Sequence, residues 1–503
     1  MKSISLVTIS AALLLSGCTL GPDYERGAGL AEILGLGSED ADGASFIAAP
    51  DHAATAANTI SHWWERLGDP TLIPLVTEML ANNNDLAVSA ARVLQAHASL
   101  ENIAGSRLPS LDLAPSANRS FTTNQAGDRT YTNNVTVGTT LSWQADLFGR
   151  LRRSERTQAA SFAAAQADWQ GLIHTQIATL VKTRVALATL QRRLDATNAI
   201  AESRRATLEA VERRYRAGLE RTNAVDLHAA RENYTSALAD IPSLENDIAA
   251  TTTSLQVLLG RIPGSALANL KTLTNVPPPQ DVPLGVPATL LDRRPDLRAA
   301  EFRLEAATEN VGVAIADLYP NLTLTGTFSS ADSSVSNLFD ITSLAGSLMG
   351  QIAQPLFDGG ARRATVRQRE AQVEEQAAVY AGNILTAFKE VEDALTAERQ
   401  SAKRLIQLES TLREGRAAEA SAFDRFRRGI GAYETLLETQ RRLQLAEQTL
   451  LIEQQNKWNA RINLLLALGG DWLDIASPSE SEAANSTSTN TNTKDIEAYE
   501  THS

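Results

Sequence analysis

The sequence predicts a mixed, mainly α fold, in which long antiparallel helical hairpins combine with four β-strands and the whole arrangement occurs twice. Two stretches rich in Ala, Leu, Arg, Glu and Gln contain no proline, one between Pro115 and Pro242 and one between Pro355 and Pro478. Because these residues favour helix and proline interrupts it, both stretches should be helical over most of their length. A period-two alternation of apolar and polar residues precedes each stretch and predicts strands.

An internal repeat organises the chain. Residues 84–113 align without a gap with residues 295–324, and the match continues to the turns Tyr215-Arg216-Ala217-Gly218 and Phe426-Arg427-Arg428-Gly429. A repeat of this length exceeds the periods of solenoid proteins, so it predicts two large structural halves.

The long helices should form two antiparallel pairs, with turns at Gly218 and at Gly429 to Gly431. Pro242 should kink or break its helix. Gly260 and Gly469 should cap helix C-termini, because glycine readily adopts the left-handed conformation found there. The predicted helices, in chain order, are 70–106, 150–216, 223–260, 360–427 and 433–468.

The strands should have one apolar and one polar face. From Tyr131 to Leu147 the odd positions are mostly apolar and the even positions polar, and residues 124–128 form the turn from an earlier strand that starts near Leu111. Residues 322–329 alternate in the same way, and a strand over 344–357 completes the second hairpin. Four strands cannot close a barrel alone, yet alternation with Thr-rich inner faces is typical of outer-membrane barrels. The alternative is the edge of a soluble sandwich.

The N-terminus predicts export. Lys2 gives a positive start, residues 4–15 are apolar but too few to span a bilayer, and Leu15-Ser16-Gly17-Cys18 ends the segment. This end resembles a bacterial lipobox, in which the cysteine thiol receives diacylglycerol after cleavage before Cys18. Thr19 stands where an Asp would resemble an inner-membrane retention signal, so outer-membrane sorting is expected. The alternative is a small buried cysteine in an ordinary signal peptide.

These patterns divide the chain into six segments. A Pro-rich linker lies between the halves, and a polar tail follows the second half. The segments are a signal peptide (1–17), a lipidated N-terminal segment (18–68), the first repeat (69–260), the Pro-rich linker (261–291), the second repeat (292–473) and a disordered polar tail (474–503).

Composition excludes several classes of function. The 503 residues carry a net charge of −13 without a basic patch, which argues against nucleic acid as a partner. One cysteine cannot form an internal disulfide, and no run of about 18 apolar residues encodes a transmembrane helix. The 6 histidines show no metal-ligand spacing, and the chain has neither a Gly-rich phosphate loop nor a Gly-x-Ser-x-Gly motif. We therefore expect no enzyme activity, no metal site and no cofactor.

Together these features resemble the outer-membrane efflux proteins, or TolC-like exit ducts, and more closely the NodT-type lipoproteins that serve RND pumps. The resemblance covers about residues 15–473. Its most specific pieces are Cys18-Thr19-Leu20-Gly21-Pro22-Asp23-Tyr24, Trp63-Trp64 with Asp69-Pro70-Thr71-Leu72, and the paired Tyr/Phe-Arg-x-Gly turns. It implies a homotrimer in outer-membrane lipid, with one shared β-barrel and a periplasmic α-helical tunnel. It also implies two partners, a periplasmic adaptor (membrane fusion) protein and an inner-membrane RND pump.

The resemblance also implies a gate at the helical tips, where the family has a Leu, an Asp and an Arg. Here Glu434 replaces the Leu and Glu438 the Asp, while Arg441 is retained, so a purely hydrophobic plug is not expected. On a threefold axis each Glu becomes a ring of carboxylates, as in cation-selective pores. The alternative is that both are exposed residues paired with Arg441 or Arg442. The candidate gate residues are Glu434, Glu438, Arg441, Asp226 and Arg231.

The two tip turns are basic and aromatic, which makes them candidates for docking the adaptor. The alternative is that they only keep the turns soluble. The candidate docking residues are Arg214, Tyr215, Gly218, Arg425, Phe426 and Gly429.

Two other functions remain open at this stage. A type I secretion duct shares the architecture but typically lacks a lipobox. A structural periplasmic coiled-coil lipoprotein explains the anchor and the helices but leaves the strands without a role. The cargo is not specified, since the only methionines, Met1, Met79 and Met349, form no Met-rich metal path.

Overall fold

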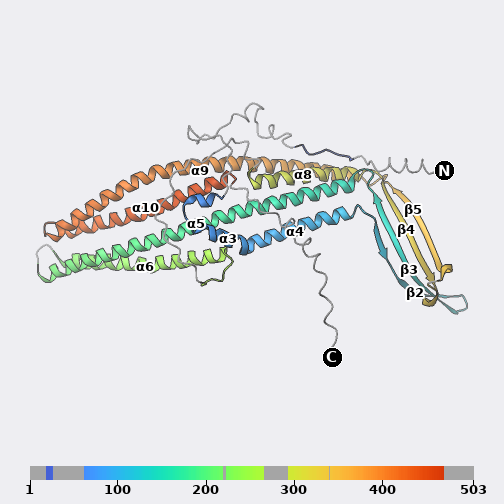
Figure 1. Ribbon diagram of the computed structural model, residues 1–503, viewed down its shortest axis with the longest axis horizontal. Helices are drawn as coiled ribbons and strands as arrows, with labels where there is room; N and C mark the ends of the chain where they lie inside the picture. The colour runs from blue at the N-terminus through green and yellow to red at the C-terminus, as the bar shows by residue number, and fades with distance from the viewer. Residues whose placement is uncertain (1–18, 26–61, 219–221, 266–292, 339, 470–503) are drawn as a thin grey trace, which may run out of the picture.

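The computed structural model describes residues 19–25, 62–218, 222–265, 293–338 and 340–469. It shows an elongated bundle of helices with a sheet projecting from one end (Figure 1). The predicted signal peptide, Cys18, most of the Pro-rich linker and the polar tail lie outside the described residues.

Two long helical hairpins form the bundle. They consist of α5 (Arg150–Arg216) with α6 (Ala224–Leu258) and α9 (Ala361–Arg427) with α10 (Tyr433–Ala467). Both turns lie at the end of the bundle farthest from the sheet (Figure 1). Helices α5 and α9 each have 67 residues, about 100 Å at 1.5 Å per residue, and α6 and α10 each have 35. The predicted bounds of these four helices are confirmed to within two residues. A duplication as the origin of the two halves stays a prediction.

Helix α6 continues through Pro242, so the predicted break there is wrong. Proline removes the hydrogen bond to the carbonyl four residues earlier, at Leu238. Both Pro242 and Leu238 are exposed, so water can hydrogen-bond to this carbonyl. A proline on the solvent-exposed side of a packed helix therefore does not interrupt the helix.

The predicted helix 70–106 is two helices, α3 (Leu72–Asn82) and α4 (Asn84–Gly105). The Asn83 side-chain oxygen accepts hydrogen bonds from the amides of Asp85 (2.9 Å) and Leu86 (3.1 Å), which caps α4 and ends α3. Its amide also donates to the Leu258 carbonyl at 2.9 Å. A polar contact to the end of α6 thus explains a break that helix periodicity does not reveal.

The predicted C-terminal glycines are confirmed. Gly260 and Gly469 follow α6 and α10 with φ of +69° and +94°. A Cβ atom at residue 260 would lie 2.2 Å from the carbonyl oxygen of Asn82. Glycine is therefore needed there for close packing as well as for its backbone conformation. A further helix, α8 (Pro295–Ala316), packs against α5 and α9.

The largest apolar cluster lies midway along the bundle, around the short 3₁₀ helix η1 (Trp63–Leu67). Next to it, Asp69 accepts hydrogen bonds from the Thr71 amide (3.0 Å) and hydroxyl (2.6 Å), and it pairs with Arg184 of α5 at 3.2 Å. The charged groups of Asp69 and Arg184 are both buried. The Trp-Trp and Asp-Pro-Thr-Leu motifs thus attach the segment before α3 to α5.

The sheet consists of β1 (Ser110–Leu113), β2 (Ser116–Thr123), β3 (Arg129–Ala145), β4 (Asn321–Asp332) and β5 (Leu344–Ala353). All pairs are antiparallel, and β3 pairs with β1, β2 and β4, while β4 also pairs with β5. The described residues thus form five strands instead of the predicted four. The first predicted strand is interrupted at Ala114 and Pro115, where proline has no amide to donate. The last ends at Ala353 rather than Phe357, two residues before Pro355.

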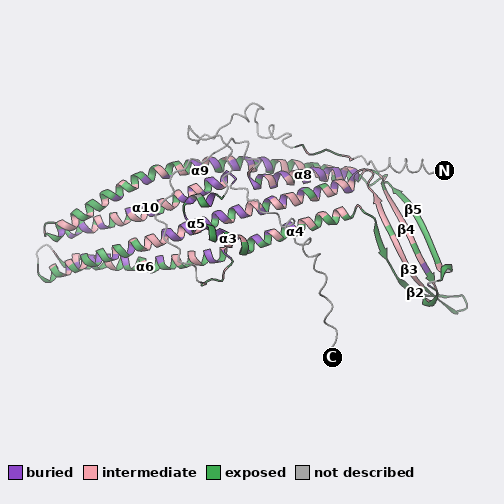
Figure 2. Ribbon diagram, viewed as in Figure 1, coloured by how far each residue is buried: buried purple, intermediate pink, exposed green. Residues whose placement is uncertain are grey.

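The register places most apolar side chains of the strands on one face; Met349, opposite Thr325, lies on the other. Leu141 of β3 lies opposite Gly326, which lies opposite Leu348, and Trp143 lies opposite Leu324. The other face carries mainly Ser, Thr, Asn and Gln. Figure 2 shows that the strands have few buried residues, and Leu348 and Ile352 are 82% and 70% exposed. The apolar face is therefore uncovered in the single chain.

Among the described residues, none of the helices is both long enough and apolar enough to span a membrane. Strand β5 and the β1–β2 side also lack a further pairing partner within the described chain.

Candidate functional site

The tips of the four long helices meet in one apolar cluster. At its centre Phe426 is 2% exposed, and the Arg214 guanidinium lies 4.3 Å from the centre of its ring. The Phe426 and Tyr433 rings are 5.9 Å apart and meet edge to face. The cluster as a whole joins the tips of α5, α6, α9 and α10. The buried members of the cluster are Val211, Leu227, Ala230, Phe426, Tyr433 and Leu436.

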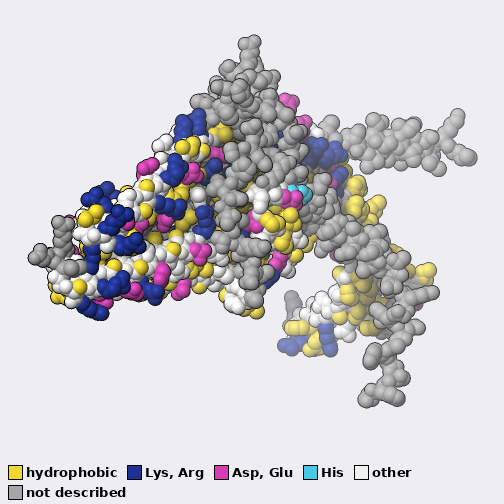
Figure 3. Space-filling model, turned by 60° about the vertical axis from the view of Figure 1, so that its left-hand side comes forward, with side chains coloured by type: hydrophobic (Ala, Val, Ile, Leu, Met, Phe, Trp, Pro, Cys, Tyr) yellow, Lys and Arg dark blue, Asp and Glu magenta, His cyan; other side chains and the backbone are white. Residues whose placement is uncertain are grey.

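Most of the candidate docking residues lie on the surface of this tip. Tyr215 is 43% exposed and Arg425 is exposed, while Gly218 and Gly429 have φ of +64° and +83° and end α5 and α9. In Figure 3 Lys and Arg side chains gather toward the tip end of the bundle. Phe426 is different, because it lies inside the tip cluster and cannot contact a partner directly. Its ring instead supports the guanidinium of Arg214.

The second-half gate candidates lie on the first turns of α10. Glu434 and Glu438 are both exposed. Glu438 pairs with Arg442 at 2.6 Å, and Arg441 pairs with Glu232 of α6 at 3.2 Å. Glu434 forms no ion pair with any described residue. The ion pair expected under the alternative interpretation is therefore present for Glu438 and absent for Glu434.

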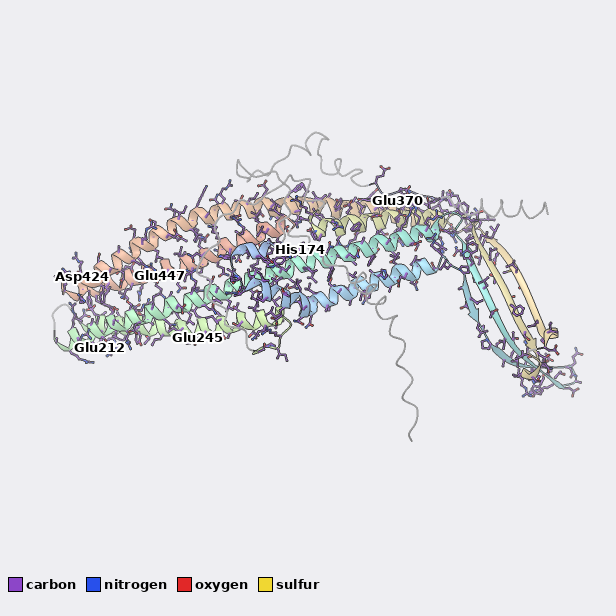
Figure 4. All side chains as sticks on the ribbon, viewed as in Figure 1. His174, Glu212, Glu245, Glu370, Asp424 and Glu447 are labelled. Atoms are coloured by element: carbon purple, nitrogen blue, oxygen red, sulfur yellow. The ribbon has the colours of Figure 1, made fainter. Side chains whose placement is uncertain are left out.

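The first-half gate candidates take part in contacts within their own hairpin. Asp226 accepts a hydrogen bond from the Asn223 amide at 3.0 Å and completes a capping box at the start of α6. Arg231 pairs with Glu212 of α5 at 2.9 Å, and this hydrogen bond holds the pKa of the Glu212 carboxyl below its usual value. Glu212 lies near the tip of α5 (Figure 4). In the single chain, the gate residues of the two halves are linked through Arg441 and Glu232 rather than through Asp226 or Arg231.

Sequence reasoning missed a polar seam between α5 and α10, which starts next to the tip cluster. Three glutamines, four residues apart on α10, face polar partners on α5. Arg204 of α5 is buried and also donates to the Asn233 carbonyl of α6 at 2.7 Å. The four-residue spacing of the glutamines was the available signal. The contacts across the seam are Gln440 with Thr207 (3.2 Å), Gln444 with Arg204, and Gln448 with Thr197 (3.3 Å).

Tyr433 is the member of the tip cluster that begins α10, the helix that carries the glutamines of the seam. Burial raises the pKa of its phenol to about 12. The phenol oxygen is buried and has no hydrogen-bond partner among the described residues. Tyr433 therefore contributes its ring to the tip without using its hydroxyl.

A pocket of about 660 Å³ lies farther from the tips, among α5, α8, α9 and α10. His174 is part of its lining and is labelled in Figure 4. Arg294 closes one side through Glu390 at 2.7 Å, Asp296 at 2.8 Å and the Ala467 carbonyl at 3.2 Å. This arginine connects α8, α9 and α10, a structural role that the sequence did not predict.

Comparison with known proteins identifies the family. The family model described as outer membrane efflux protein matches residues 75–261 and 286–470. The chain belongs to the outer membrane efflux protein family. It is 31% identical over 466 residues to the solvent efflux pump outer membrane protein SrpC of Pseudomonas putida, with 92% of this chain and 97% of SrpC covered. It is 30% identical over 495 residues to the cation efflux system protein CusC of Escherichia coli, with 94% of this chain and 100% of CusC covered.

A solved structure of the outer-membrane channel OprN is similar to this efflux protein throughout. The two agree with a TM-score of 0.80 and 29% sequence identity, and the match covers 90% of this chain and 100% of OprN. The efflux protein is therefore an exit duct of an RND-type efflux system in the outer membrane. The family is one of transport channels and not of enzymes.

Proposed function

We propose that three copies of this efflux protein form one channel, which carries small molecules across the outer membrane. Each copy contributes its sheet to a shared transmembrane β-barrel. The observation that carries this proposal is the sheet itself, with one uncovered apolar face and two edges without partners. Backbone groups at a strand edge cannot remain unpaired in lipid, so the edges need strands from other copies. The apolar face then meets lipid, and the Ser- and Thr-rich face meets water.

The long hairpins of the three copies form a periplasmic tunnel in this assembly. Their polar composition supports this, because a water-filled tunnel needs charged and polar side chains on its inner face. The sequence has only three methionines, so it gives no reason to assign a metal cargo. Of the relatives, CusC is named for cation efflux and SrpC for solvent efflux. We assign the chain a broad class of small molecules.

Membrane attachment is proposed to include acylation of Cys18 after removal of residues 1–17. The lipobox-like sequence before Cys18 supports this modification. One thiol carrying a diacylglycerol, together with an acyl chain on its amine, would give firm attachment.

The helical tips are proposed to have two roles. Glu434, Glu438 and Arg441, with Asp226 and Arg231 of the first half, narrow the tunnel. The exposed docking residues around Tyr215 and Arg425 contact a periplasmic adaptor, which connects the duct to an inner-membrane RND pump. Support for the gate comes from the exposed carboxylates of Glu434 and Glu438 at the start of α10.

The proposal is tested with the full acylated chain, purified from outer membranes and reconstituted in planar bilayers. A trimer that resists SDS until heated, and that gives discrete cation-preferring conductance steps, is expected. A monomer without conductance would exclude the channel and favour the structural lipoprotein. To distinguish an efflux duct from a type I secretion duct, cells lacking this protein are tested for accumulation of a fluorescent small molecule and for secretion of protein substrates. Accumulation with normal secretion is expected, and the reverse would contradict the proposal.

A further inference from the structure

The residues that directly follow Cys18 are held by a buried arginine. Arg153, in the first turn of α5, has 0% exposure. Its two terminal nitrogens donate hydrogen bonds to the backbone carbonyls of Pro22 (3.0 Å) and Gly21 (3.1 Å). One of them also pairs with the Asp23 carboxylate at 2.9 Å. Arg153 thus binds three consecutive residues of the N-terminal segment, two of them through the backbone.

The charge of Arg153 is balanced by α8. Glu309 is buried and lies 2.8 Å from Arg153. Arg156 lies 3.6 Å from Asp23 and 3.8 Å from Glu309, so it bridges the same two carboxylates. A buried guanidinium needs acceptors for its remaining donors, because leaving them unpaired is unfavourable. The Gly21 and Pro22 carbonyls supply acceptors for its two terminal nitrogens, while its Nε has no hydrogen-bond partner among the described residues. The terminal nitrogens are therefore fully paired only with the N-terminal segment in place.

Three glycines let the segment lie close to the helices. A Cβ atom at Gly21, whose φ is +99°, would lie 2.7 Å from the Gly312 Cα atom of α8. A Cβ atom at Gly312 would lie 2.9 Å from the Arg153 side chain and 3.1 Å from the Leu20 carbonyl oxygen. A Cβ atom at Gly149, just before α5, would lie 3.0 Å from Thr19. Side chains at these three positions would therefore prevent the observed approach.

Tyr24 provides a second point of attachment. Its hydroxyl donates to Glu301 of α8 at 3.1 Å. Burial, together with the charge of Glu301, raises the pKa of the Tyr24 phenol. The segment is therefore held at both ends of the Gly-Pro-Asp-Tyr sequence.

We propose that Arg153, Glu309 and Gly312 form a docking site for the segment after the acylated cysteine, and that this docking fixes the lipid anchor beside the junction of sheet and helices. Residues 19–24 and their docking site are called the anchor latch below. The proposal that the latch positions lipid rests on acylation of Cys18. Thr19 contacts Gly149, which lies between the end of β3 and the start of α5, and adjacent Cα atoms are 3.8 Å apart. Thr19, the residue after the cysteine, is therefore held close to the level at which the sheet begins.

The latch is tested by Gly21→Ala in the full-length acylated protein. This change blocks docking through the clash with Gly312 while leaving α5 and α8 unchanged, whereas Arg153→Met could also impair folding. Gly68→Ala is the matched control, because Gly68 also has positive φ (+75°) but a Cβ there would meet nothing within 4 Å. Chymotrypsin cleavage after Tyr24 is measured by mass spectrometry. Tyr24 is partly buried and hydrogen-bonded to Glu301 when the segment is docked. We therefore expect slow cleavage in the unmodified chain and the control, and cleavage at least about tenfold faster in Gly21→Ala.

The effect on anchoring is measured separately in cells. The measured quantity is the fraction of newly made, acylated protein that forms trimers which resist SDS until heated. Gly21→Ala should lower this fraction severalfold, and Gly68→Ala should not. Equal cleavage rates in Gly21→Ala and the unmodified chain would overturn the docking site. An unchanged trimer fraction, despite faster cleavage, would overturn its role in placing the anchor.

Cys18→Ser separates this inference from the proposed lipidation. Tyr24 should remain protected from chymotrypsin in that variant, since the contacts of the latch do not involve the lipid. A missing acyl mass on the unmodified chain would contradict the proposed modification while leaving the docking site intact.

Discussion

Arg441 of α10 and Glu232 of α6 form an ion pair, with 3.2 Å between Nη2 and Oε2, that joins the two returning helices near the tips. Both side chains are more than half exposed. Exposed pairs of this kind contribute about 0.2–1 kcal/mol and are weakened by salt. This one ion pair, among the contacts that join the two hairpins, is therefore weak enough to be broken by a modest competing interaction.

The first prediction concerns this link. Arg441→Ala should shift the trimer toward conducting states by up to about fivefold, the equivalent of about 1 kcal/mol, because it removes the ion pair between α6 and α10. Single-channel recording of reconstituted trimers at low ionic strength measures the effect, which should shrink in 1 M salt. Arg442→Ala is the control, since within the described part of the chain Arg442 pairs only with Glu438 on its own helix. Equal behaviour of the two variants would remove Arg441 from the gate.

The second prediction concerns the carboxylates. Glu434→Ala combined with Glu438→Ala should raise conductance and weaken cation preference, because the change removes both the bulk and the charge of the proposed rings. The Gln double variant keeps the size and removes the charge, so it should lose selectivity with a smaller rise in conductance. Unchanged conductance and selectivity in the Ala double variant would contradict a gate at these residues.

The third prediction concerns Tyr433. Its hydroxyl has no partner among the described residues, so Tyr433→Phe should change the free energy of unfolding by less than about 1 kcal/mol at pH 7. The pKa of about 12 lies above the ordinary value of 10, so the folded state favours the neutral phenol. This contribution to stability is complete below pH 10 and is lost as the pH rises toward 12.

Urea unfolding at pH 7 and pH 11 measures both effects of Tyr433. The unmodified chain should lose more stability than Tyr433→Phe between the two pH values. Tyr215→Phe, which alters an exposed tyrosine at the same tip, should behave like the unmodified chain.

The fourth prediction concerns Asp69. Asp69→Ala should destabilise the folded protein by about 3–5 kcal/mol, because it leaves the buried Arg184 guanidinium without its carboxylate. Asp393→Ala removes an exposed pair with Lys389 and should cost less than about 1 kcal/mol. Thermal unfolding followed by helical circular dichroism compares the two. Similar losses of stability in the two variants would show that the buried Asp69–Arg184 pair contributes no more than an exposed ion pair.

The sequence was sufficient for features encoded by local pattern. Glycines at 218 and 429 and helix-favouring composition located the long helices, and period-two alternation identified the two faces of the sheet. Contacts between segments that are distant in the sequence could not be predicted from such local patterns. The break at Asn83 depends partly on the end of α6, the burial of Phe426 depends on Arg214, and each glutamine of the polar seam depends on a partner more than two hundred residues away.

The gate was predicted only as a set of residues. Resemblance to a family located the tip positions, but it could not show which side chains were already paired. Asp226 is a helix cap and Arg231 pairs within its own hairpin, because backbone amides and Glu212 are closer to them than the second half of the chain.

The open edges of the sheet have a consequence for biogenesis. A single chain has no low-energy inserted state, since both β5 and the β1–β2 side would enter the bilayer with bare backbone groups. In the proposed trimer, closure and insertion then occur as one event in which three chains take part. When the rate of synthesis is lowered, the yield of assembled trimers should consequently fall more steeply than the rate itself. Unassembled chains should accumulate and be degraded by periplasmic proteases.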